Sequence, residues 1–169
     1  FDRLYIWAVE FDKKLAERMD KNKSYFLSIF EIERKNTDRV RKDYGVLSKV
    51  WDEISYFFKD SFNYNLEDFK RDMPNIDINS AKDIISEFEN IYNENDTKDE
   101  WFTKIKDLAQ KNGYALNSKE FDSSLHKGSI SDFVAIFRYL LTGRKNSPDL
   151  YSIMKVLGKG EVFRRLEII

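Results

Sequence analysis

The sequence predicts an all-α protein made of two consecutive helical-bundle subdomains. Three observations support this prediction. Apolar residues recur at intervals of three and four along most of the 169-residue chain, the spacing that lines one face of a helix. Apolar residues make up 41% of the chain and aromatic residues 15%, which is enough for a packed core. Glycines and short polar residues flank the periodic runs, where helices end and begin.

Composition limits the possible functions. The chain has 29 basic and 30 acidic residues and a formal net charge of -1, so any surface that attracts nucleic acid must be local. It has no cysteine, which excludes disulfides and thiolate metal sites, and no run of about 18 apolar residues that could cross a bilayer. We therefore expect a cytoplasmic protein. The amphipathic pattern begins at once with Phe1, which suggests a piece of a longer polypeptide.

In the first half, three apolar stripes predict helices over residues 4–19, 25–32 and 47–58. The stretch 34–45 between the second and third helices is too polar to bury and ends at Gly45. It carries five early basic residues: Arg34, Lys35, Arg39, Arg41 and Lys42. We expect this stretch to be an exposed joint.

The middle of the chain is acidic. Residues 77–100 hold eight acidic and two basic residues, a combination that would repel RNA. Asn79 or Ser80 can cap a helix that runs to Ile91, and Asp96 or Thr97 can cap the next one, which ends at Gly113. We place the subdomain boundary near residue 97, which predicts subdomains over 1–97 and 98–169.

The last part of the chain predicts a loop over 116–128 and then two helices joined by a tight basic turn. Ser129 or Ser131 begins the first helix, and Gly143 ends it. Arg144 and Lys145 follow on the turn. Ser147 suits the N-cap of the next helix and Pro148 its first position, because proline lacks an N–H that would be unpaired there. That helix ends at Gly158, and a short last helix carries Val162, Phe163 and Leu166.

Residues that carry out catalysis are missing. His126 is the only histidine, so no His–Cys or His–His metal site can form, and neither a phosphate loop nor a dinucleotide-binding glycine motif is present. Paired acids such as Glu87 and Glu89 fit a solvated helix face, since nothing nearby predicts burial that would raise a pKa. We expect neither a metal nor a cofactor in this chain, and no catalytic residue.

Several motifs, in this order and spacing, resemble one family. They are "RYLLTG" at 138–143, "SPDL" at 147–150, Leu157-Gly158 and Arg165-Leu166, preceded by "WFTKIKDLAQKNGY" at 101–114 and "HKGSISDFVAIFRYLLTG" at 126–143. "WAVEFDKKL", "IER", "RKD" and "ISYFF" in the first half fit the same family. The chain resembles the C-terminal anticodon-binding region of bacterial glutamyl-tRNA synthetases, most weakly over residues 60–97. Gly160 is a departure, since the family favours a helix former such as glutamate there.

The resemblance implies a tRNA-binding module without its catalytic domain. The parent enzyme would be a glutamate–tRNA ligase that uses ATP and Mg²⁺, and the partner would be tRNA-Glu, with tRNA-Gln left open. Neither DNA nor a membrane is implied as a partner, and we expect a monomer. A pocket for the first anticodon base is expected from Arg138, Ser147, Pro148 and Leu150, beside phosphate contacts from Arg144 and Lys145. Arg41 is the first choice for reading the third base, with Lys42 beside it.

Two other functions remain open on sequence alone. The chain could be a helical protein-interaction scaffold without RNA binding, which would show no salt-sensitive binding to tRNA. The two helices over 130–157 also have the look of a DNA-binding helix-turn-helix. The second of them, however, carries Tyr151, Ile153, Met154 and Val156, which leaves few polar positions to read base edges.

Overall fold

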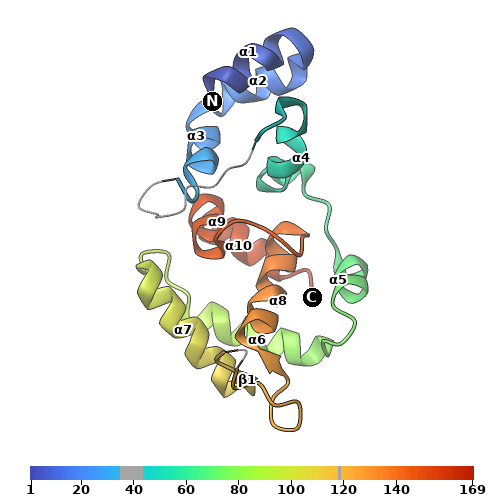
Figure 1. Ribbon diagram of the computed structural model, residues 1–169, viewed down its shortest axis with the longest axis vertical. Helices are drawn as coiled ribbons and strands as arrows, with labels where there is room; N and C mark the ends of the chain where they lie inside the picture. The colour runs from blue at the N-terminus through green and yellow to red at the C-terminus, as the bar shows by residue number, and fades with distance from the viewer. Residues whose placement is uncertain (35–43, 118) are drawn as a thin grey trace. The chain divides into compact units, whose positions relative to one another are not determined.

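The structure is a computed structural model that describes residues 1–34, 44–117 and 119–169. It confirms the all-α prediction: within these ranges the elements are helices, apart from one short parallel pair of strands (Figure 1). The strands are β1 (Tyr114–Ala115) and β2 (Gly128–Ser129). No helix in the described ranges is long and apolar enough to span a membrane.

The chain forms two compact units. Unit 1 comprises Phe1–Asn63 and Pro148–Val156, and unit 2 comprises Tyr64–Ser147 and Leu157–Ile169. Residue 97 therefore lies inside unit 2, not between the units. The physical reason is that hydrogen bonds join the segments before and after residue 97. Lys104 Nζ donates to Asp96 Oδ2 at 2.6 Å and to the Ile91 carbonyl at 3.0 Å. Two anticodon-binding subdomains over 1–97 and 98–169 stay a prediction.

Unit 1 begins with α1 (Asp2–Phe11), α2 (Lys13–Lys21) and α3 (Lys23–Glu31). The prediction of one helix over 4–19 was wrong, because Asp12 interrupts it with a non-helical backbone at φ -145°. The Asp12 carboxylate accepts from the Leu15 N–H at 3.0 Å and so caps α2. Ala8, Met19 and Phe26 are fully buried. Phe11 belongs to the apolar spacing that predicted the helix over 4–19, yet its side chain is 65% exposed.

The predicted helix over 47–58 is also interrupted. It consists of η1 (Leu47–Lys49), α4 (Val50–Ile54) and η2 (Ser55–Phe57), and η3 (Lys59–Ser61) follows. Arg18 holds this segment: it donates to both carboxylate oxygens of Asp60 at 2.8 and 2.7 Å. Its guanidinium carbon also lies 4.8 Å from the ring centre of Trp51. The apolar spacing indicated the buried face but did not distinguish a continuous helix from short helical turns.

Unit 2 begins with α5 (Leu66–Asp72), which the sequence analysis missed, and α6 (Ile78–Ile91). α5 is short and only Phe69 in it is buried, so it has no apolar stripe to detect. Asp77 caps α6 by accepting from the Ser80 N–H at 2.7 Å, so the predicted caps Asn79 and Ser80 were wrong. A carboxylate suits this position because its charge complements the positive end of the helix dipole.

The other helices of unit 2 are α7 (Lys98–Lys111), α8 (Ile130–Thr142) and α10 (Lys159–Leu166). Of the two candidates predicted at each start, Thr97 caps α7 and Ser129 caps α8. Each forms a capping box with an acidic residue three positions later, which the sequence analysis did not predict. Phe88 on α6 packs against Phe137 on α8, with ring centres 4.7 Å apart. This aromatic contact lies in the core of unit 2, five residues before α8 ends at Thr142 and the basic turn begins.

Candidate nucleic-acid interface

The basic turn leaves α8 at Gly143. This residue has a left-handed backbone, φ 66° and ψ 21°, which confirms the predicted helix stop. Thr142 ties the turn to the helix: its hydroxyl donates to the Arg138 carbonyl at 2.7 Å and accepts from the Arg144 N–H at 3.2 Å. The direction in which the chain leaves α8 is therefore set by hydrogen bonds as well as by the glycine.

Arg138 closes the same turn from its other end. Its Nη1 donates to the Ser147 carbonyl at 3.0 Å and to the Ser147 hydroxyl at 2.9 Å. The structure thus brings together two of the residues predicted to bind the first anticodon base. It also assigns Arg138 a role within the chain, because one guanidinium nitrogen is engaged by Ser147. Contact between Arg138 and RNA stays a prediction.

The predicted start of the next helix was wrong by two residues. α9 (Leu150–Leu157) is capped by Asp149, whose Oδ2 accepts from the Ser152 N–H at 3.0 Å and the Ser152 hydroxyl at 2.6 Å. Ser147 is not the cap: it lies three residues before Leu150, its oxygens accept from Arg138, and Pro148 also precedes the helix. α9 and Pro148 belong to unit 1, where Leu150 is 4% exposed. A side chain buried to this degree is a core residue, so the expected base contact from Leu150 is not supported.

Glu33 is a residue of this region that the sequence analysis did not single out. Within unit 1, its Oε1 accepts from the Asp149 N–H at 2.8 Å, directly at the start of α9. Its backbone is left-handed at φ 57°, which is uncommon for a residue with a side chain. The only signal in the sequence was its place in the "IER" motif. Glu33 therefore joins the end of the α3 segment to α9.

The charge of the C-terminal part differs from the simple sequence count. Residues 126–169 hold eight basic and four acidic residues. Arg165 is fully buried, however, where it donates to the Leu141 carbonyl and to Glu161 Oε1, and Arg164 pairs with the same carboxylate at 2.6 Å. Without these three residues, six basic and three acidic residues remain. The excess of positive charge persists, but Arg165 is a core residue and does not contribute to an RNA-binding face.

Two of the predicted RNA-binding residues, Arg41 and Lys42, lie outside the described residues, which omit 35–43.

The two basic residues of the turn differ in exposure. Lys145 is exposed and Arg144 is half-buried, so at least one cation of the turn faces solvent. Within the described ranges, no cluster of three or more histidine or acidic side chains could hold a metal ion. The exposed Lys145 gives the turn a positive charge that suits the recognition of an anion such as phosphate.

Comparison with known proteins shows what the C-terminal region and the whole chain are similar to. Residues 124–169, which include the whole basic turn, match the family described as anticodon binding domain. Glutamate–tRNA ligase of Clostridium perfringens strain 13 is 32% identical over 168 residues, which cover 98% of this chain and 31% of that protein. Glutamate–tRNA ligase of Acetivibrio thermocellus is 30% identical over 169 residues, covering 99% of this chain and 30% of that protein.

The chain thus spans about a third of the length of these relatives. No solved structure gives a significant match. The comparisons do not favour the alternative of a helical interaction scaffold. The chain is therefore similar, along nearly its whole length, to about a third of glutamate–tRNA ligase, and its residues 124–169 match the anticodon binding domain family.

Proposed function

We propose that this chain recognises the anticodon loop of tRNA-Glu as part of a glutamate–tRNA ligase. The observation that carries the proposal is the basic turn from Gly143 to Ser147, which lies inside the region that matches the anticodon binding domain. The turn is held by Arg138 and Thr142 and presents Lys145 to solvent. Such pre-ordering favours binding because less conformational freedom is lost when RNA docks.

Catalysis belongs to the remainder of the parent enzyme under this proposal. The parent would bind ATP and Mg²⁺ and join glutamate to tRNA, while this chain alone would activate no amino acid. Its place of action would be the cytoplasm, where tRNA is charged, and one copy would suffice for one anticodon loop. Use of tRNA-Gln as a second substrate would depend on how the third anticodon base is read.

The test is a binding titration of the 169-residue chain with fluorescent tRNA-Glu and with the same tRNA carrying a different anticodon. We expect binding that weakens with salt, because each phosphate neutralised contributes about 0.7–0.9 to the log–log slope. We also expect the altered anticodon to bind less tightly. Equal affinity for both tRNAs would overturn anticodon recognition, and an absence of binding at low salt would overturn the function altogether.

A further inference from the structure

Tyr64 packs directly against the basic turn within unit 2. A Cβ atom added to Gly143 would lie 3.0 Å from Tyr64 Cδ2 and 3.4 Å from Tyr64 Cβ and Cγ, so the ring already touches the glycine. The same ring stacks on Tyr139 in the last turn of α8, with ring centres 6.4 Å apart and an angle of 17° between the planes. Tyr64 therefore contacts both the end of α8 and the residue at which the chain turns.

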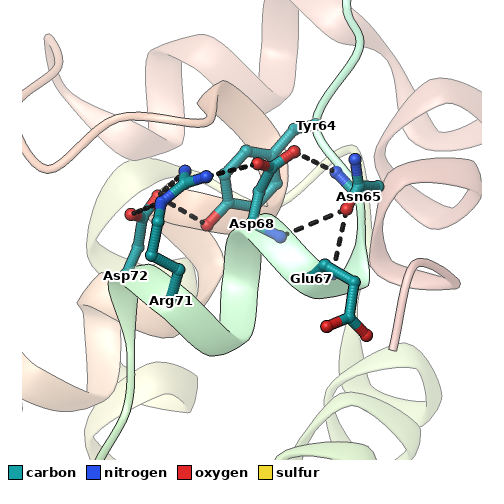
Figure 2. A network of polar contacts seen from close by, with 6 residues as sticks. All are labelled: Tyr64, Asn65, Glu67, Asp68, Arg71 and Asp72. Carbon is teal, nitrogen blue, oxygen red and sulfur yellow. Dashed lines mark hydrogen bonds and ion pairs between the residues drawn. The ribbon is translucent and has the colours of Figure 1, made fainter.

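The hydroxyl end of Tyr64 is held by α5. Tyr64 Oη donates to Asp72 Oδ2 at 3.2 Å, and Arg71 donates to the same carboxylate at 3.0 and 3.2 Å (Figure 2). Burial, aided by the charge of Asp72, raises the pKa of Tyr64 above its ordinary value of 10, so the hydroxyl stays a donor near neutral pH. The ring is thus fixed at one end by hydrogen bonds and at the other by packing.

α5 is itself anchored by its capping residues. The Asn65 side chain accepts from the Glu67 and Asp68 N–H groups, and Asp68 Oδ2 accepts from the Asn65 N–H at 3.2 Å (Figure 2). Asp68 Oδ1 in turn accepts from Arg71 Nη1 at 2.7 Å. Two carboxylates around one guanidinium leave the network with a negative charge, which makes it unsuitable for contacting phosphate. The member of the network that contacts the basic turn is Tyr64.

We propose that Tyr64 is a positioning residue for the anticodon-binding turn. By packing on Gly143 and Tyr139, it fixes the direction in which Arg144 and Lys145 leave α8, and α5 holds Tyr64 in place. This inference rests on the proposed function and adds a segment, residues 64–72, that no motif of the sequence associated with RNA. It predicts that loss of the ring misaligns the cations even though Tyr64 touches no RNA.

The experiment compares Tyr64→Phe and Tyr64→Leu, alone and combined with Lys145→Gln, in titrations with tRNA-Glu over a range of salt concentrations. Tyr64→Phe keeps the ring and should bind within about twofold of the wild type. Tyr64→Leu should bind about five- to tenfold more weakly, with a log–log salt slope smaller by about 1, because one phosphate contact is lost. Since both changes act on the same contact, adding Lys145→Gln should weaken it little further.

The matched control is Phe102→Leu, which also removes an aromatic ring. Phe102 lies on α7 and is 41% exposed, and its replacement should leave the log–log salt slope unchanged. Tyr64→Met replaces Tyr64→Leu in the experiment if the latter does not fold, with the same expectation. An unchanged salt slope, or a full additive loss on combination with Lys145→Gln, would overturn the positioning role. Failure of the wild-type chain itself to bind tRNA would instead overturn the proposed function, so the two failures can be told apart.

Discussion

Arg138 and Ser147, nine residues apart in sequence, are joined by two hydrogen bonds from a single guanidinium nitrogen. These bonds close the basic turn. If Arg138 also contacts RNA, Arg138→Ala should weaken tRNA binding by about 1–3 kcal/mol, the range for a lost base stack or paired base contact. Ser147→Ala is the control, since it removes one acceptor and leaves the Arg138 side chain. Fluorescence titration measures both. Equal effects would show that Arg138 acts only by closing the turn.

Gly143→Ala should destabilise unit 2. Alanine at φ 66° is strained, and its methyl group would press on the Tyr64 ring at 3.0 Å, so we expect a loss of about 1–3 kcal/mol in the free energy of unfolding. Gly160→Ala is the matched control, because Gly160 is helical and a methyl group there meets no other atoms. Alanine at this position should increase the free energy of unfolding by about 0.5–1 kcal/mol. Urea denaturation compares them. Equal changes for the two variants would contradict the strained turn.

Asp149→Ala should destabilise α9 by about 0.5–2 kcal/mol, because it removes the cap on the Ser152 N–H. Asp149→Asn keeps an acceptor oxygen and should lose only part of this. Ser147→Ala should change the stability of α9 much less, in contrast to what the sequence pattern predicted. Thermal unfolding followed by circular dichroism measures these differences. A larger loss from Ser147→Ala would restore serine as the cap.

Glu161→Gln should reduce stability at neutral pH but not in strong acid. Burial opposes ionisation of this carboxyl, but hydrogen bonds from Arg164 and Arg165 outweigh it and lower the pKa of Glu161 from 4.5 to about 2. A lowered pKa stabilises the fold above pH 4.5, and that contribution disappears as the pH falls toward 2. We expect a difference of about 2 kcal/mol at pH 7, below the 3–5 kcal/mol of a fully buried pair because Glu161 is partly exposed.

Denaturation of the wild type and Glu161→Gln at several pH values provides the measurement. The difference between their free energies of unfolding should shrink between pH 4.5 and pH 2, while the profile of the variant is flatter there. A difference that stays constant across this range would show that Glu161 stabilises the fold by packing, without its charge.

If the chain is part of a glutamate–tRNA ligase, as proposed, Arg41→Gln in that full-length enzyme should narrow the preference for cytosine over guanine at the third anticodon position. A planar guanidinium can offer paired donors to a base edge, which the amide of glutamine cannot reproduce. Lys42→Gln is the control, because a phosphate contact should weaken all tRNAs alike. Charging rates with anticodon variants of tRNA-Glu measure the effect. Uniform loss with Arg41→Gln would assign this residue to the phosphate backbone.

The sequence alone determined where unit 2 places its last helices. Thr97, Ser129, Gly143 and Gly158 act through hydrogen bonds and backbone freedom within a few residues of themselves, so their effects can be predicted locally. The order and spacing of the motifs also carried the resemblance to an anticodon binding domain, which residues 124–169 match. Where two local signals competed, as at Ser147 and Asp149, local rules could not choose between them.

Only the tertiary structure decided that choice and several others. Arg138 lies nine residues from Ser147 in sequence and donates to both serine oxygens, while Asp149 caps α9. Arg165 is buried and donates to the Leu141 carbonyl and to Glu161, although its sequence neighbourhood looks like a basic surface. Tyr64 packs against Gly143, which lies 79 positions later in the sequence. Each of these contacts joins groups that are distant or competing in sequence, and such contacts depend on how the helices pack, which residue spacing does not encode.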